Sequence, residues 1–220
     1  MAPQHSRPED SKQSSGVFNL KYQLAQYASH HNNPVNIGIH LTCIPLILWS
    51  ALIFAAKTGP LFQTLRAPGF LARLSKIFPP NAGILTMMAY CLYYIKLDKV
   101  AGLLTAPLFI GLAKHATTFN ATRTDATKVA TQVQIVAWGA QFIGHGVFEG
   151  RAPKLTENLL QALVLAPYFV AYEVLFALGY RPHLKAELDK LVEADIREWK
   201  ARRATQTMRY SSRRWWWQME

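Results

Sequence analysis

Cysteine and acidic residues are scarce in this chain of 220 residues, which has two cysteines and 13 Asp and Glu against 24 Lys and Arg. Cys43 and Cys91 lie inside apolar runs, without the spacing of a zinc site or of a disulfide framework, so neither is predicted. The shortage of acids leaves a net charge of +11. Because the basic residues flank apolar segments, we expect them to meet anionic lipid headgroups and not nucleic acid.

The motifs of several common enzyme classes are missing as well. The sequence has no Gly-rich phosphate loop and no Gly-x-Ser-x-Gly nucleophile elbow. The repeated histidine boxes of membrane desaturases are also missing, since His30-His31 is the only histidine doublet. Residues 1–19 contain no apolar core of a cleaved signal peptide, and we interpret residues 1–16 as a disordered polar lead.

Half of the residues are hydrophobic, and they are gathered in blocks separated by polar segments. The first block has twenty residues, about the length that spans a bilayer, and Pro45 is expected to kink it. Two blocks of fourteen residues are short for a span and predict a hairpin or a tilted pair. The pattern predicts an all-α, polytopic membrane protein of about four to five apolar helices plus interfacial amphipathic helices. The blocks are Ile37–Ala56, Ala82–Ile95, Val100–Ala113, Val129–Phe148 and Leu159–Gly179.

The remaining segments predict how the chain is divided. Phe18–His30 is mildly amphipathic and suited to a membrane surface. The basic segment Lys57–Pro80 predicts either an amphipathic segment in the membrane surface or a cytoplasmic loop that obeys the positive-inside rule. We expect residues 17–180 to form one helical membrane domain that carries the catalytic site. Residues 181–220 form a basic amphipathic tail that ends in three tryptophans beside arginines. Such a tail suits either the headgroup region or a helix packed on the protein.

An imidazole-rich stretch precedes the first long apolar block. Asn33-Pro34 predicts a helix start, with Asn33 as the cap and Pro34 at the first helical position. Asn36 and His40 are then four residues apart on one helical face. His30 and His31 lie just before this helix, where they can fold back towards His40.

A second polar stretch, Gln141-Phe-Ile-Gly-His145-Gly-Val-Phe-Glu149, ends the block Val129–Phe148. His145 and Glu149 are spaced to share a helical face. If the four blocks from 37 to 148 all cross the membrane, this end lies on the same side as the first histidines. Two or three imidazoles with an optional carboxylate suit non-haem Fe(II).

Polar side chains inside apolar runs are expensive, so they tend to be functional or paired. Glu173, in the last block, can orient a histidine through its second ring nitrogen or serve as a hydrogen-bonded structural carboxylate. The histidines themselves can equally be hydrogen-bonded core residues, and His115 is a weaker candidate for a ligand.

These motifs resemble the yeast-type 2-hydroxy fatty acid dioxygenases, a family of small endoplasmic-reticulum membrane proteins. The similarity is carried by Tyr27 with His31-x4-Asn36-x3-His40-x4-Pro45, by Gln141 to Pro153, and by Pro167-x5-Glu173. It covers roughly Phe18 to Tyr180, and the Trp-rich tail is not part of it.

The resemblance implies an Fe2+-dependent enzyme that uses O2 to shorten a 2-hydroxy fatty acid by one carbon, in the degradation of phytosphingosine. It implies His31, His40 and His145 as iron ligands and Glu149 as a fourth ligand or acid/base partner. Asn36 would orient a ligand or bind the substrate. Gln141, Glu173 and His30 are expected to support the ligands or contact the substrate.

Two alternatives remain open from the sequence. One is a related non-haem iron oxygenase of specialised metabolism that acts on another hydrophobic acid. The other is a non-catalytic lipid-binding membrane protein whose histidines are merely hydrogen-bonded. Membrane lipids are expected partners in each case, and the sequence indicates no oligomeric state.

Overall fold

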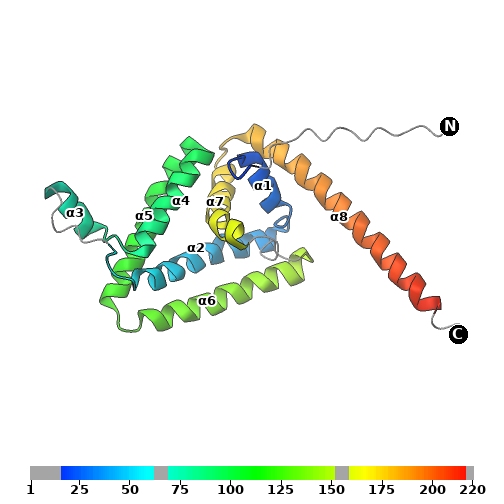
Figure 1. The fold of residues 1–220 in the computed structure, drawn as a ribbon. Helices are drawn as coiled ribbons and strands as arrows, with labels where there is room; N and C mark the ends of the chain where they lie inside the picture. Colours follow the sequence, from blue (N-terminus) through cyan, green and yellow to red (C-terminus); the bar gives the residue numbers. More distant parts are fainter. Residues whose placement is uncertain (1–15, 62–68, 152–158, 217–220) are drawn as a thin grey trace.

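The computed structural model describes residues 16–61, 69–151 and 159–216, and all regular structure in these ranges is helical (Figure 1). This confirms the all-α prediction. The expected polar lead lies almost wholly outside the described residues, as do Pro153, Trp217 and the middle of the basic segment. The helices are α1 (Leu20–Ala28), α2 (Pro34–Ala56), α3 (Gly69–Ile77), α4 (Ala82–Leu97), α5 (Lys99–Thr122), α6 (Ala126–Ile143), the π-helix η1 (Gly144–Glu149), α7 (Leu159–Ala177) and α8 (Pro182–Trp216).

Side-chain caps set the start of the central helices. The Asn33 side chain accepts a hydrogen bond from the Val35 N–H at 2.9 Å, and Pro34 takes the first helical position, as the sequence predicted. Asn81 caps α4 in the same way through the N–H of Ile84. These caps satisfy N–H groups that would otherwise lack a partner at a helix start.

Each of the five apolar blocks forms a helix, but they differ in length. By length and hydropathy, α2 and α5 can cross a membrane, and α7 with the first part of α8 forms a pair bent by 118° that counts as at most a third span. The block Val100–Ala113 lies within α5, which has 24 residues and continues through polar residues to Thr122. α4 stays a shorter apolar helix. The chain is a helical membrane protein.

Helix α2 lies at the centre of the arrangement (Figure 1). Helix α6 runs along it, α4 and α5 pack near its C-terminal end, and α1, α7 and η1 surround its N-terminal end. Helix α8 contacts α1 and then extends away from the body. The N-terminal end of α2 is therefore the place where α1, α7 and η1 meet, with α6 leading into η1.

The core is rich in buried tyrosine. Tyr94 and Tyr168 stack with their ring centroids 4.3 Å apart, and Tyr172 packs edge-on against Tyr168. Helices α4 and α5 approach closely at Gly102, where an added Cβ would lie 2.4 Å from the Ile95 nitrogen. A side chain at residue 102 would push the two helices apart.

Asp98, between α4 and α5, is a buried carboxylate with a full set of partners. It accepts hydrogen bonds from the N–H groups of Val100 and Ala101, which caps α5. It also accepts from the hydroxyls of Tyr172 and Tyr180, and Arg181 lies 3.2 Å away. Burial alone would raise the pKa of Asp98, but these hydrogen bonds and the Arg181 charge together hold it below its ordinary value. The cluster joins the α4–α5 turn to the turn between α7 and α8.

Candidate metal centre

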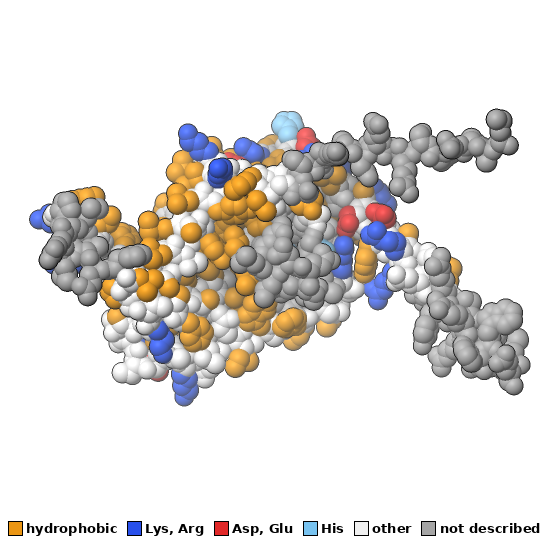
Figure 2. Space-filling model, in the orientation of Figure 1, with side chains coloured by type: hydrophobic (Ala, Val, Ile, Leu, Met, Phe, Trp, Pro, Cys, Tyr) orange, Lys and Arg blue, Asp and Glu red, His pale blue; other side chains and the backbone are white. Residues whose placement is uncertain are grey.

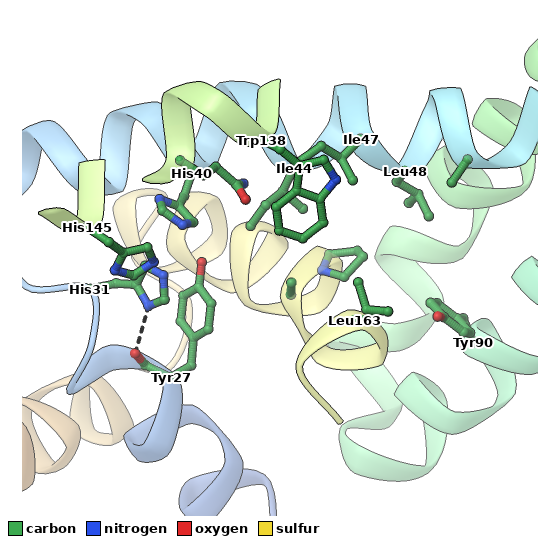
Figure 3. A pocket seen from close by; sticks show the side chains of 14 residues that line it. Tyr27, His31, His40, Ile44, Ile47, Leu48, Tyr90, Trp138, His145 and Leu163 are labelled. Carbon is green, nitrogen blue, oxygen red and sulfur yellow. Dashed lines mark hydrogen bonds between the residues drawn. The ribbon is translucent and has the colours of Figure 1, made fainter. Parts of the chain in front are cut away.

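Three histidines from separate elements converge at the N-terminal end of α2 (Figure 3). His31 follows α1, His40 lies in α2 and His145 lies in η1. All three are buried, and one ring nitrogen of each lies within 4.8 Å of the others. The ring centroids are 4.3 to 4.8 Å apart and the rings meet nearly edge-on. Three imidazole nitrogens around one point are a common ligand arrangement for a divalent transition metal.

Backbone carbonyls fix the tautomers of His31 and His40. Nδ1 of His31 lies 2.9 Å from the Tyr27 carbonyl oxygen, and Nδ1 of His40 lies 2.9 Å from the Asn36 carbonyl oxygen (Figure 3 shows the first). Because a carbonyl can only accept, each Nδ1 carries the hydrogen and each Nε2 carries the free lone pair. Metal-binding histidines typically use their second nitrogen in this way.

His31 is also held by its neighbour in the preceding helix. Its ring stacks on that of Tyr27 at 3.8 Å, and Tyr27 stacks in turn on Phe169 of α7. Burial lowers the pKa of His31 well below its ordinary value, and a charge on His40 would lower it further. The imidazole is therefore neutral at physiological pH, which is the state that binds a metal.

His145 lies on a π-helix that the sequence did not predict. We expected α-helix through Glu149, but residues 144–149 form η1, which ends at Gly150 with a φ of +65°. An added Cβ at Gly144 would lie 2.4 Å from Oδ1 of Asn36, so only glycine allows η1 to lie this close to α2. Single π-turns within helices are frequent at functional sites.

Three buried polar atoms around the histidines have no hydrogen-bond partner in the described chain. They are Oδ1 of Asn36, Nε2 of Gln141 and Nδ1 of His145. Buried polar groups are nearly always paired, so a concentration of unpaired ones indicates a missing ligand. Nε2 of Gln141, a residue that lines the cavity, and the neutral donor set of three imidazoles fit a bound metal with a polar ligand beside it, whereas Oδ1 of Asn36 packs against Gly144.

Glu149 is placed at the start of α2 and not among the ligand atoms. Its carboxylate accepts hydrogen bonds from the N–H groups of Asn32 and Asn33 and from Nδ2 of Asn36, at 3.0 to 3.2 Å. A carboxylate is favourable at a helix N-terminus, where the N–H groups point outward. In this position Glu149 holds η1 against α2 and fixes Asn36, one turn before His40.

The other predicted residues lie around the cluster. Gln141 lines the cavity beside the histidines. Glu173 borders a small cavity on the far side of His31 and His40, and burial together with this carboxylate raises the pKa of Tyr27. His30 is buried next to His31 but is not part of the three-histidine cluster. His115 is not part of the three-histidine cluster, and its Nδ1 accepts a hydrogen bond from the Trp49 indole.

A cavity of about 210 Å³ opens from the histidines. The three imidazoles lie at one end of it (Figure 3). Gln141 also lines the cavity, and the rest of the wall is almost entirely apolar. Trp138 in this wall was not predicted, although it stands one and two helical turns before Gln141 and His145 and so shares their face. The cavity suits a ligand with one polar end and a long apolar tail.

Fold and site together define a helical membrane protein with a buried three-histidine centre at the end of an apolar cavity. A family profile described as 2-hydroxy-palmitic acid dioxygenase Mpo1-like matches residues 17–178. The chain is also 36% identical over 189 residues to the 2-hydroxy-palmitic acid dioxygenase MPO1 of Saccharomyces cerevisiae, covering 86% of this chain and 98% of the yeast protein. The chain belongs to this Mpo1-like family, as the motifs predicted. No solved structure matches it.

Proposed function

We propose that the protein is a non-haem iron dioxygenase that uses O2 to shorten a 2-hydroxy fatty acid by one carbon. The observation that carries the proposal is the set of three buried imidazoles at the closed end of an apolar cavity. The yeast relative, whose name describes a dioxygenase acting on 2-hydroxy-palmitic acid, supports the substrate class.

His31, His40 and His145 would hold the iron, His31 and His40 through their free Nε2 atoms. When bound, Fe(II) supplies the redox chemistry with O2 and a Lewis acid for the carboxylate and hydroxyl of the substrate. The fixed Nδ1 hydrogens of His31 and His40 hold the two rings in one orientation. Burial of the cluster keeps bulk water away from the reacting end of the substrate.

Gln141 is the residue best placed to bind the head of the substrate. Gln141 lines the cavity and its Nε2 is buried without a partner in the described chain, so this amide would donate a hydrogen bond to the substrate carboxylate when the substrate is bound. Asn36 does not line the cavity, and its side chain is held by Glu149 and packed against Gly144. We therefore assign Asn36 and Glu149 the role of positioning His40 and η1.

Family membership also supports two broader proposals. The protein would act in the endoplasmic-reticulum membrane, and the reaction would serve the degradation of phytosphingosine. These two proposals, on location and pathway, rest on family membership, whereas the proposed reaction rests on the cavity and the histidines as well.

Oxygen uptake tests the proposal. Detergent-purified protein, loaded anaerobically with Fe(II), is given 2-hydroxypalmitic acid, and the products are analysed by mass. We expect uptake with formation of an acid one carbon shorter, abolished in His40→Ala and His145→Ala and retained in His183→Ala, whose histidine is exposed. Bound iron without uptake would point to another hydrophobic acid as substrate. If the protein shows no bound iron and no oxygen uptake, the oxygenase is refuted and a lipid-binding protein is favoured.

A further inference from the structure

The cavity has a direction that follows α2. His40, Ile44, Ile47, Leu48 and Ala51 all line it, and their spacing places them on one helical face. At about 1.5 Å per residue, this row runs for about 16 Å along the helix. That is the scale of a long-chain acyl tail and not of a short-chain acid. Tyr90 of α4 lies at the end away from the histidines (Figure 3).

Burial changes steadily from one end of the cavity to the other. His40 and His145 at the end with the imidazoles are each 5% exposed. At the far end Leu163 is 40% exposed, Ala51 is exposed and Tyr90 is partly buried. As far as the described residues show, the cavity is thus closed where the histidines are and open between α2, α4 and α7.

The open end is apolar and lies in the part of the protein suited to lipid. Its residues Leu48, Ala51, Tyr90 and Leu163 include no charged side chain, and α2 is a membrane-spanning helix by length and hydropathy. Figure 2 shows apolar side chains spread over much of the surface of the body in this view. An opening of this kind in an apolar surface faces acyl chains, because in a membrane such surface is covered by lipid.

We propose that this open end is a lateral portal through which the acyl chain of the substrate enters from the bilayer, with its far methylenes remaining in lipid. The proposal rests on the proposed function for the identity of the head group, but not for the path of the tail. Its consequence is that the enzyme does not measure total chain length. A tail that outgrows the cavity continues into lipid, where it meets no wall.

The first test is a series of 2-hydroxy acids of increasing length at equal mole fraction in lipid nanodiscs. The portal predicts that kcat/KM stays level within about twofold for all tails long enough to pass the opening, since every further methylene lies in lipid both before and after binding. A steep fall of kcat/KM beyond one chain length would overturn the proposal, because it would show a closed end.

The second test blocks the opening. Ala51→Trp should lower kcat/KM at least tenfold for a long-chain 2-hydroxy acid, whose bound tail still passes through the opening, and should lower it less for a short-chain acid, which lies wholly inside once bound. Leu46→Trp is the matched control, since Leu46 is exposed on the same helix but does not line the cavity, and it should change neither substrate. No effect of Ala51→Trp on the long-chain acid, or an equal loss in Leu46→Trp, would overturn the portal.

A binding measurement separates the portal from the reaction. Metal-free protein is given long-chain fatty acids brominated either near mid-chain or at the last carbons, and tryptophan fluorescence is measured. The quenching of Trp138 is the difference between wild type and Trp138→Phe. Mid-chain bromine should quench Trp138 in the cavity wall, whereas terminal bromine should not. If metal-free protein shows this quenching pattern but Fe(II)-loaded protein turns over no 2-hydroxy acid, the proposed reaction is refuted and the portal stands. Equal quenching by both acids, or none by either, would refute the portal whatever the reaction.

Discussion

Two buried polar clusters in this protein differ in how completely their atoms are paired. Around Asp98, backbone N–H groups, two tyrosine hydroxyls and Arg181 all point at one carboxylate. Around the three histidines, an amide oxygen, an amide nitrogen and a ring nitrogen are buried without a partner. The described chain therefore completes the first cluster by itself and leaves three polar atoms of the second unpaired.

The difference follows from the free energy of burial. A buried polar group without a partner costs about 1–3 kcal/mol, so a folded chain keeps several together only where something else binds them. A fully partnered carboxylate has the opposite effect and stabilises the elements that it joins. Asp98 is thus a structural residue of the fold, whereas unpaired buried atoms such as those near the histidines lower the stability of a chain as long as nothing is bound to them.

The largest expected effect on stability is at Asp98. Asp98→Ala removes the α5 cap and leaves the Tyr172 hydroxyl without its acceptor, so we expect a loss of about 3 kcal/mol in the free energy of unfolding. Thermal unfolding in detergent, followed by circular dichroism, measures it. Asp125→Ala is the control, because Asp125 is exposed and pairs with Arg123, and it should leave the midpoint unchanged. A midpoint for Asp98→Ala equal to that of wild type would show that the cluster does not hold the helices together.

Gly144→Ala should disturb the histidine cluster next most strongly. The new Cβ would meet Oδ1 of Asn36 at 2.4 Å, so Asn36 must leave Glu149 or η1 must move away from α2. We expect about 1–3 kcal/mol of destabilisation and a 10- to 100-fold loss of iron affinity, which equilibrium dialysis measures. Gly146→Ala, whose added Cβ meets nothing within 4 Å, should change neither quantity. Equal effects of the two substitutions would contradict the close packing of η1 on Asn36.

The third prediction concerns pH. The folded protein holds the pKa of Asp98 below its ordinary value of 3.8, so the unfolded chain takes up this proton first as the pH falls. The ionised carboxylate therefore contributes stability above about pH 4 and loses it as the pH falls through the folded pKa. The gap in unfolding free energy between wild type and Asp98→Asn should be constant from about pH 8 to 5 and narrow below 4. A gap that already narrows near pH 6 would mean that burial outweighs the hydrogen bonds.

The smallest expected effect is a change in the free energy of unfolding that differs in sign between an unpaired buried amide and a hydrogen-bonded one. Gln141→Met removes an unpaired Nε2 at similar volume, so metal-free protein should be unchanged or up to about 1 kcal/mol more stable, while turnover falls. Gln23→Met is the matched control, since the buried Gln23 amide donates to the Gly16 carbonyl, and it should destabilise. Chemical unfolding and oxygen uptake measure the two quantities. Destabilisation by Gln141→Met would show that Gln141 is already satisfied within the chain.

Local chemistry explains what the sequence could predict. Asn33-Pro34 places the start of α2 because a cap and a first-position proline act within a few residues. The three histidines His31, His40 and His145 do lie together, as expected. That expectation assumed four crossings, whereas in the described residues only α2, α5 and at most the bent α7–α8 pair are long and apolar enough to span a membrane.

Long-range contacts explain what the sequence could not predict. Asp98 pairs with tyrosines 74 and 82 positions away, so its role appears only in the folded chain. The π-helix depends on the contact of Gly144 with Asn36 of another helix. The position of Glu149 at the start of α2 likewise depends on how η1 packs, and its sequence spacing from His145 gave no indication of it.

The most direct test of the central claim is the iron stoichiometry of the three histidine variants. Metal-free protein is titrated with Fe(II) under anaerobic conditions, and bound iron is counted after dialysis. The account predicts about one iron per chain for wild type and for His183→Ala, and a loss of affinity of more than about 100-fold in His31→Ala, His40→Ala and His145→Ala alike. Full iron binding by any one of these three variants, with its fold intact, would contradict a centre built from all three histidines.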